Sequence, residues 1–559
     1  MFSNTRVRLG PTVTATAAVA VGLFSLLPLL YLLATGVSWH DIRRQLRYPG
    51  VGAAIWQTVE LTVVISTVSV LVGVGAALLV VRTTLPYPKL FTVLFALPLA
   101  VPGFVSAYAA YSTELVYAPR LGLATSFWGA SMVMALTLYP YVFLPSVIAL
   151  RAVDPAHEEV AASLRPWRAT ILWRVVLPAL RPAIGGGVLI VALHVLAEFG
   201  AMDQLGRSTL TTKVMGEMLD YGDYRSARSL SLLLMGLSII VLLVTRWLTG
   251  RGHATDLARG TARPPRRWDL GPLRIPVAAL ALVVPGIAVG PTLFMTVRGL
   301  TTPERHIDVD WAQVGSALTT TLGYAVAAAL VASVLALPVS WWITRRPSTL
   351  ATLTERCIWA AHALPSAILG LALVYLATRA VPDLYKTPSV LVASYVILFL
   401  PLAVANQRVG LTVTRRAYDD VAASLGARPL RAFLRINLPL AIPGFLAGAL
   451  LVGLDASKEL NTTLMLIPYN AQTLSSQLWA TTNGESLDFT AASPYAAMLV
   501  LLGLPMVLML TRHTLRHIET TPAGAVPRSI VRQQESDAGG PRAAHEHVPH
   551  GGAGTTADL

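Results

Sequence analysis

Twelve apolar stretches, each long enough to cross a lipid bilayer, constrain the fold of this chain more than any other feature. A helix needs about 20 apolar residues to span the hydrocarbon. The stretches begin near Thr12, Gln57, Leu90, Phe127, Ala183 and Ser229, and then near Ile275, Ser316, Ile358, Ser389, Gly444 and Pro494. Hydrophobic residues make up 54% of the chain and charged residues only 13%, which excludes ordinary soluble domains. The sequence therefore predicts an all-α membrane protein with about 12 transmembrane helices.

Several of these stretches contain Pro and Gly, as in 97–103 (LPLAVPG) and 138–145 (LYPYVFLP). Such residues are tolerated in membrane helices that pack against neighbours. We expect kinked spans there, not loops.

The distribution of Lys and Arg predicts the orientation, because basic residues in short loops stay on the cytoplasmic side. With the N-terminus inside, the predicted cytoplasmic segments hold 24 Lys and Arg, more than twice the number predicted outside. These segments are 1–10, 82–89, 151–181, 251–274, 345–356 and 408–435. Arg43, Arg44 and Arg47 lie on the wrong side, so the first hairpin is the weakest part of this topology. We expect a multi-pass plasma-membrane protein, surrounded by membrane lipid, with cytoplasmic N- and C-termini.

The net charge of +14 does not indicate a nucleic-acid partner. The basic residues are scattered over the predicted inner loops and form no single stripe with aromatic residues. Because the membrane topology explains them, we expect no nucleic acid among the partners.

An internal repeat organises the chain. Three features recur at one offset of 261 residues: EVAASL at 159 and DVAASL at 420, Leu-Pro at 177 and 438, and glutamate at 198 and 459. Because each copy carries six spans, an even number, both copies enter the membrane from the same face. The solute pathway is therefore expected between the two halves.

The repeat also sets the expected domain boundaries. We predict a first permease half over 1–250 and a second over 275–515, joined by a cytoplasmic linker over 251–274 that is rich in Arg, Gly and Pro. The remainder, 516–559, is poor in apolar residues and is expected to be a disordered cytoplasmic tail.

Each half contains one predicted cytoplasmic loop with an amphipathic helix, 154–182 in the first half and 414–443 in the second. Asp154-Pro155 is a helix-start signal, and Pro178 and Pro182 are expected to end the helical run before the next span. Small residues at 161–163 would let a partner surface approach closely.

These loops resemble the "EAA" loop of ATP-binding-cassette importer permeases, which carries a coupling helix that docks into a cleft on the ATPase subunit. The second loop matches with Gly426, whereas the first has Arg165 at that position, so its turn is expected to differ. The resemblance implies coupling roles for Glu159, Ala161, Ala162, Ser163 and Pro178 in the first loop, and for Asp420, Ala422, Ala423, Gly426 and Pro439 in the second.

The same resemblance implies partners. Two copies of an ATP-binding-cassette ATPase subunit and an extracytoplasmic solute-binding protein would assemble with this chain. The sequence has no Gly-Lys dipeptide and therefore no phosphate-cradling loop that ends in Gly-Lys-Ser/Thr, so the partner subunit would use the ATP. We expect a transport subunit without catalytic residues or a bound cofactor.

Charged residues inside predicted spans are costly and indicate function. They are Glu60, Glu198, Asp455, Lys458 and Glu459. Asp455 and Lys458 are three residues apart, so they could neutralise one another. Glu198 and Glu459 stand at equivalent positions after the two coupling loops. We predict that Glu198, Lys458 and Glu459 line the translocation pathway, and we assign no metal site.

The residues around these glutamates resemble ferric-iron importer permeases. Residues 196–200 (LAEFG) resemble their Ala-Asp-Phe-Gly stretch, and 458–464 (KELNTTL) resemble their Lys-Glu-Leu-Pro-Ala-Thr-Leu, with Asn461 in place of Pro. The resemblance implies import of ferric iron by alternating access, and carboxylates suit a hard cation.

Other substrates remain open, because the same fold and loops serve importers of thiamine, polyamines, sulfate and phosphonate. An ion-coupled secondary transporter could also have two parallel six-helix halves with buried carboxylates. It would, however, have no reason to keep the paired coupling loops.

Overall fold

The computed structural model of the chain is built from helices. It describes residues 9–34, 39–153, 163, 168–249, 267–301, 309–413, 416–425, 427, 429–483 and 489–519. Within these ranges the only paired extended residues form an isolated bridge between Thr83 and Trp268. The predicted all-α class is therefore confirmed.

The helices of the first half are α1 (Leu9–Ala34), α2 (Trp39–Arg47), α3 (Val51–Arg82), α4 (Pro88–Ala96), η1 (Leu97–Ala100), α5 (Gly103–Tyr117), α6 (Phe127–Leu138), α7 (Pro140–Ala152), α9 (Arg168–Ile171), η2 (Leu172–Val176), α10 (Leu177–Ala197), α11 (Gly200–Gln204), α12 (Leu210–Leu219) and α13 (Tyr224–Thr249).

The helices of the second half are η4 (Gly271–Leu273), α14 (Arg274–Thr301), α15 (Trp311–Arg345), α16 (Thr349–His362), α17 (Ser366–Ala380), η5 (Pro382–Leu384), α18 (Pro388–Val413), α19 (Arg416–Ser424), α20 (Pro429–Ala432), η6 (Phe433–Asn437), α21 (Leu438–Lys458), α22 (Asn461–Leu466), α23 (Leu474–Thr482) and α24 (Phe489–Glu519).

Nine helices in the described ranges are long and apolar enough to cross a membrane, and the number rises to 12 if each of three bent helix pairs is one span. The pairs are α4–η1 with α5, bent by 89°, α6 with α7, bent by 43°, and α16 with α17, bent by 98°. The first two bends fall in the stretches where prolines predicted kinks. The third lies at Pro365, whose extended backbone precedes the first residue of α17. Each of the twelve predicted stretches thus corresponds to one span or one bent pair.

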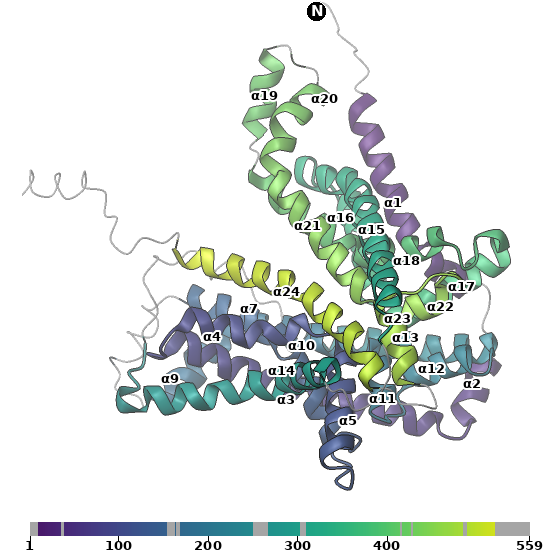
Figure 1. Ribbon diagram of the computed structural model, residues 1–559. Coiled ribbons are helices and arrows are strands. Elements are labelled where there is room, and N and C mark those ends of the chain that lie inside the picture. Colours follow the sequence, from purple (N-terminus) through teal and green to yellow (C-terminus); the bar gives the residue numbers. More distant parts are fainter. Residues whose placement is uncertain are drawn as a thin grey trace, which may run out of the picture.

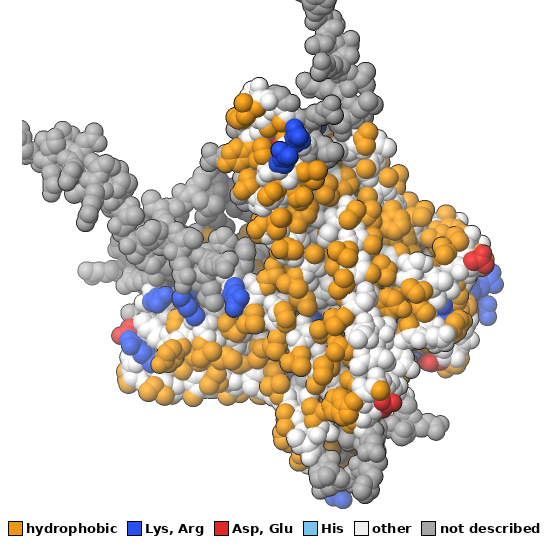
Figure 2. Space-filling view, turned by 45° about the horizontal axis from the view of Figure 1, so that its top comes forward, with side chains coloured by type: hydrophobic (Ala, Val, Ile, Leu, Met, Phe, Trp, Pro, Cys, Tyr) orange, Lys and Arg blue, Asp and Glu red, His pale blue; other side chains and the backbone are white. Residues whose placement is uncertain are grey.

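The outward side chains of the long helices are apolar. Leu71 of α3 is 69% exposed, and Leu330 and Val334 of α15 are 62% and 70% exposed. Figure 2 shows hydrophobic side chains over most of one face of the molecule, with charged side chains mainly towards its edges. Such a surface is compatible with lipid and not with water, which agrees with the membrane-spanning prediction.

The first helix of each half packs against the other half. Helix α1 lies along α15, α16 and α17, whereas α14 lies along α5 and α6 of the first half and along α24 of its own half. Ala18 and Leu32 of α1 belong to the same buried cluster as Ala332 of α15. On α14, the ring centroid of Phe294 is 5.6 Å from that of Tyr117 in α5. The two halves of the sequence therefore exchange their first helices.

The sequence repeat persists as a repeat of hydrogen bonds. The first backbone N–H of α12 donates to Thr58 Oγ1, and that of α23 donates to Thr321 Oγ1, both at 2.9 Å. Both helices begin with a capping box, built on Thr209 in the first half and on Thr473 in the second. The duplicated geometry indicates pseudo-twofold symmetry between the halves.

The prediction that Pro178 and Pro182 end a helical run is wrong. The chain stays helical from α9 through the π-helical turn η2 into α10, and α20, η6 and α21 repeat this arrangement. A proline ring clashes with the carbonyl four residues before it in an α-helix. In η2 the N–H of Leu177 donates instead to the carbonyl of Leu172, five residues earlier. The wider turn accommodates Pro178, and Pro182 lies inside α10.

The two loop-bearing ends of the molecule lie far apart. In Figure 1, α19 and α20 mark the end of one arm at the top, and α9 marks the end of the other at the lower left. Helices α11, α22 and α23 lie where the two arms meet. Any pathway between the halves therefore passes close to the short helices that follow α10 and α21.

Candidate translocation site

Two glutamates form equivalent turns where the halves meet. Glu198 follows α10 with φ −74° and ψ 115°, and Glu459 follows α21 with φ −68° and ψ 124°. The extended backbone ends each long helix. Each carboxylate then accepts a backbone N–H from the short helix that follows, from Ala201 at 3.1 Å and from Thr462 at 3.2 Å. Negative charge is favourable at a helix N-terminus, so each glutamate stabilises its own turn.

Each carboxylate also faces the break in a bent helix pair of its own half. A Cβ atom at Gly103, the first residue of α5, would lie 3.0 Å from Glu198 Oε2. The equivalent neighbour of Glu459 is Ser366, the first residue of α17, which donates a side-chain hydrogen bond to it. Both breaks follow a proline, and glycine leaves room for the first carboxylate. The arrangement is therefore built twice from different side chains.

Asn461 joins the two turns. Its Nδ2 donates to the backbone carbonyl of Ala197 and to Ser366 Oγ, both at 2.8 Å. Beside it, a Cβ atom at Gly200 would lie 2.6 Å from Leu460 Cδ2, so the halves approach closely here. The predicted pathway residues Glu198 and Glu459 are thus brought to one junction.

Lys458 reaches across to the first half. Its Nζ lies 3.4 Å from the carbonyl oxygen of Leu99 and 3.7 Å from Met506 Sδ. Leu99 belongs to η1, whose C-terminal carbonyls attract a cation. The ammonium group also interacts electrostatically with Asp455, as their spacing of three residues suggested. Glu60 lies on α3.

The structure adds three residues that the sequence analysis did not single out: Tyr141 of α7, His194 of α10 and His362 of α16. The rings of Tyr141 and His194 lie 4.7 Å apart. His194 is exposed although it lies within a long apolar helix. The sequence could have indicated His194, because the 261-residue offset makes it the counterpart of Asp455 in the second half.

The predicted coupling residues are only partly described. Glu159, Ala161, Ala162 and Gly426 lie outside the described residues, as do the side chains of Asp420 and Ala423. Ser163 and Ser424 are exposed, whereas Ala422 is buried. Pro178 and Pro439 lie in the first turns of α10 and α21.

The outward face of α19 is apolar. Tyr418, Val421 and Leu425 are 42%, 57% and 82% exposed. Their spacing of three and four residues places them on one side of the helix. Large exposed side chains thus form one face of α19.

A polar contact ties α19 to the spans. Arg345 Nη2, at the end of α15, lies 3.2 Å from Asp419 Oδ2 and 2.9 Å from Asn437 Oδ1. Asn437 Nδ2 in turn donates to Asp419 Oδ1 at 2.7 Å. The guanidinium also lies 4.9 Å from the centre of the Trp341 ring. The contact therefore joins α19 to α15 and to the π-helical turn η6 that precedes α21.

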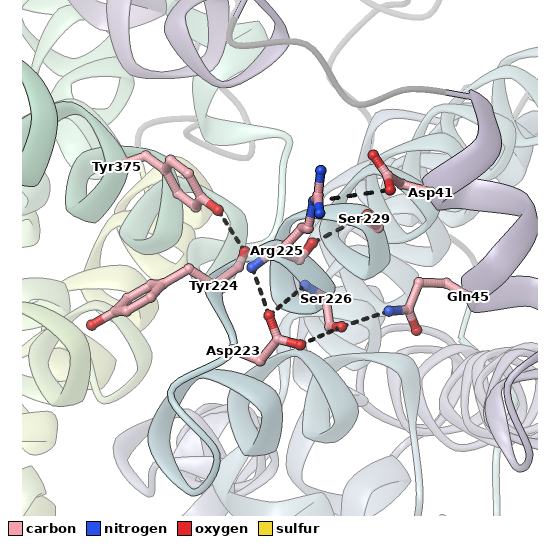
Figure 3. A network of polar contacts seen from close by, with 8 residues as sticks. All are labelled: Asp41, Gln45, Asp223, Tyr224, Arg225, Ser226, Ser229 and Tyr375. Carbon is pink, nitrogen blue, oxygen red and sulfur yellow. Dashed lines mark hydrogen bonds and ion pairs between the residues drawn. The ribbon is translucent and has the colours of Figure 1, made fainter.

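A second polar network links the halves near α2 (Figure 3). Asp223 accepts hydrogen bonds from Ser226 Oγ at 2.7 Å and from two backbone N–H groups at the start of α13. These hydrogen bonds lower the pKa of Asp223, and the bond from the Ser226 hydroxyl has the largest effect. The Tyr375 hydroxyl of α17 donates to the carbonyl of Tyr224 at 2.7 Å. The network joins the last span of the first half to the second half.

The same network accounts for the charges on α2. Gln45 Nε2 donates to Ser226 Oγ at 2.7 Å, and Asp41 lies 3.9 Å from Arg225. Arg44 interacts electrostatically with Asp223, and Arg43 lies over the Trp39 ring at 5.5 Å. The arginines of the first hairpin thus belong to a short helix that packs on α13, where acidic and aromatic groups partly balance them.

Comparison with known proteins relates the chain to membrane permeases. A family model described as "Binding-protein-dependent transport system inner membrane component" matches residues 330–514. The Fe(3+)-transport system permease protein FbpB 2 of Haemophilus influenzae is 30% identical over 499 residues, which cover 88% of this chain and 96% of that protein. The ferric transport system permease protein FbpB of Actinobacillus pleuropneumoniae is 23% identical over 492 residues, which cover 79% of this chain and 68% of that protein.

A shorter relative corresponds in size to one half. The sulfate transport system permease protein CysT of Escherichia coli is 29% identical over 266 residues, which cover 44% of this chain and 96% of that protein. The chain is a multi-pass permease of an ATP-binding-cassette importer and therefore a transport subunit. Together with the two repeats, the spans and the paired turns, the extent of the similarity to the Haemophilus influenzae protein shows that the chain belongs to the family of binding-protein-dependent transport system inner membrane components.

Proposed function

We propose that this permease carries ferric iron through the junction of Glu198 and Glu459 by alternating access. The observation that carries the proposal is the duplicated carboxylate turn at the meeting point of the two halves. Carboxylate oxygens suit a hard, highly charged cation. The names of the two iron-permease relatives support the same cargo.

Energy would come from two ATPase subunits, one on each coupling loop. The apolar face of α19, formed by Tyr418, Val421 and Leu425, suits insertion into a hydrophobic groove on such a subunit. The Arg345–Asp419–Asn437 contact would carry the resulting movement to α15 and α21. ATP would be hydrolysed in the partner, and a solute-binding protein would deliver the cargo at the opposite face.

In this proposal the loop-bearing ends and both termini are cytoplasmic, and α2 lies at the outer surface. ATP binding would draw the ends of the two arms together and open the junction to the outside. Release of the hydrolysis products would let the arms separate again. Glu198, Lys458 and Glu459 would line the route, with Lys458 held at the end of η1.

Uptake of radiolabelled iron tests the function directly. The chain, its ATPase and its binding protein would be reconstituted into vesicles, with ferric iron as cargo and with labelled sulfate as the competing cargo. We expect iron to accumulate only with ATP, and we expect accumulation to stop when 159–163 is deleted. Iron uptake driven by an ion gradient without ATP would refute the importer mechanism, whereas ATP-driven uptake of sulfate alone would refute iron as cargo.

A further inference from the structure

Two histidines, one from each half, lie close to the residues of the proposed route but have no role in it so far. His194 lies on α10 one turn before Glu198, and His362 is the last residue of α16, just before the 98° bend. By the repeat, His194 corresponds to Asp455 of α21. Equivalent positions on the two long helices therefore carry an imidazole and a carboxylate, and both groups can bind a metal ion.

Both imidazoles are held in the same tautomer. His194 Nδ1 lies 3.0 Å from the carbonyl oxygen of Ile190, and His362 Nδ1 lies 2.5 Å from that of Leu398. A carbonyl oxygen only accepts hydrogen bonds, so each Nδ1 carries the proton. The lone pair of each neutral ring is then on Nε2. Histidines that bind metals are commonly oriented by such a bond from the other ring nitrogen.

The two histidines belong to helices that meet at the junction. Ala197, three residues after His194, and Ser366, four residues after His362, accept hydrogen bonds from the same Asn461 nitrogen. The two rings are close enough to interact electrostatically. His194 is exposed and stacks on Tyr141, although its neighbours come from both halves. Each half therefore contributes one imidazole with its Nε2 lone pair, on a helix that ends close to the junction.

We propose that His194 and His362 form a two-imidazole contact site for a transition-metal ion on the translocation route. The proposal rests on the proposed function, because it assigns a step in the passage of the metal cargo. Within the described residues, no group of three or more His, Cys, Asp or Glu side chains could hold a metal ion. A two-ligand contact suits transport, because a site on a route must bind strongly enough to admit the ion and weakly enough to release it.

Binding of Co²⁺ tests the site, since Co²⁺ accepts imidazole ligands and reports them in its absorption spectrum. The full chain with its ATPase would be placed in lipid nanodiscs. Three histidines near the end of the sequence, His545, His547 and His550, would first be replaced by glutamine to give a background protein in which they cannot bind the ion. We expect His194→Gln and His362→Gln each to weaken Co²⁺ binding about tenfold, and the double variant to abolish it. The matched control is His40→Gln on exposed α2, which should bind Co²⁺ as the background protein does.

Iron uptake by the same variants separates this site from the proposed function. We expect ATP-driven uptake to fall about tenfold or more in the double variant and to be unchanged in His40→Gln. Full Co²⁺ binding by the double variant would overturn the site. Lost Co²⁺ binding with normal iron uptake would overturn its role on the route. If the background protein moves no iron, the iron function fails, and Co²⁺ binding alone then decides whether the site exists.

Discussion

The two halves of this permease share a backbone but differ in the side chains that face the junction. Both halves keep the glutamate turn, the proline-linked break, the π-helical turn and the threonine capping box. At equivalent positions of the repeat, however, His194 of the first half corresponds to Asp455 of the second, and Ala197 corresponds to Lys458. The comparison teaches that hydrogen bonds needed by the backbone were retained in both copies, whereas charges at the junction diverged.

The coupling ends differ in the same way. Arg345 at the end of α15 corresponds to Arg82 at the end of α3, and both are buried or nearly so. The second half places Asn437 beside its arginine, whereas the first half has Val176 at the equivalent position. An amide that bonds both Arg345 and Asp419 is therefore specific to the second arm. We infer that the two arms are not mechanically equivalent.

The largest expected effect tests whether the two glutamates act as charges or only as caps. Glutamine retains the side-chain oxygen that accepts the N–H of Ala201 or Thr462 but removes the charge. We expect Glu198→Gln and Glu459→Gln each to lower iron uptake by about tenfold to a thousandfold, because charged clefts concentrate their counter-ion by such factors. Vesicle uptake measures the loss.

The matched control is Glu355→Gln, which removes a carboxylate that pairs with Arg408 at the molecular surface. It should leave uptake near that of the unmodified chain. Full uptake by both junction variants would mean that the carboxylates serve the backbone alone. A loss in only one of them would break the symmetry at this position.

Replacing Asn437 by valine makes the second coupling end resemble the first. The change removes the amide that bonds both the nearly buried Arg345 and the half-buried Asp419, so we expect the protein to lose about 1–3 kcal/mol of stability. Thermal unfolding of the purified chain measures it. Val176→Asn on the first arm is the reciprocal variant and should gain nothing comparable. Equal effects of the two changes would show that the arms do not differ as inferred.

The capping boxes provide the prediction in which the halves should behave alike. Thr209→Val and Thr473→Val remove equivalent caps, so each should cost about 1 kcal/mol of stability. Equal shifts of the unfolding temperature would support the retained backbone symmetry. A cost confined to one variant would show that only one of the two turns depends on its cap.

The smallest expected effect concerns Lys458, whose counterpart in the first half is the uncharged Ala197. Lys458→Ala gives α21 the residue found at the end of α10, and it removes a cation from the C-terminal carbonyls of η1. We expect uptake to change by about two- to fivefold, the scale of a charge at a helix end. Lys213→Ala on α12 is the control. An unchanged rate would remove Lys458 from the route.

Much of the fold followed from the sequence, because each span is a local apolar stretch and the repeat offset is visible without a structure. The equivalence of Glu198 and Glu459 followed for the same reason. The exchange of α1 and α14 could not be predicted, since it depends on packing between helices hundreds of residues apart. The prediction for Pro178 was wrong because a π-helical turn relieves the clash between the proline ring and the preceding turn of the helix. No local sequence pattern predicts that turn.

The polar contacts at the site were missed for a related reason. Asn437 has partners 18 and 92 residues away, so no motif brings them together. A single histidine in an apolar helix carries little information by itself. His194 stands out only when the 261-residue offset shows that its counterpart in the second half is the charged residue Asp455.

The central claim, that ATP draws the two coupling ends together to change access to the junction, is tested most directly by a distance between spin labels. Ser163 and Ser424 are exposed and equivalent in the repeat. The labels would be attached to cysteines at these two positions after Cys357, the only native cysteine, is replaced by serine. We predict a long distance without nucleotide and a clearly shorter one when ATP is bound by the partner subunits. An unchanged distance in vesicles that still import iron with ATP would contradict the account.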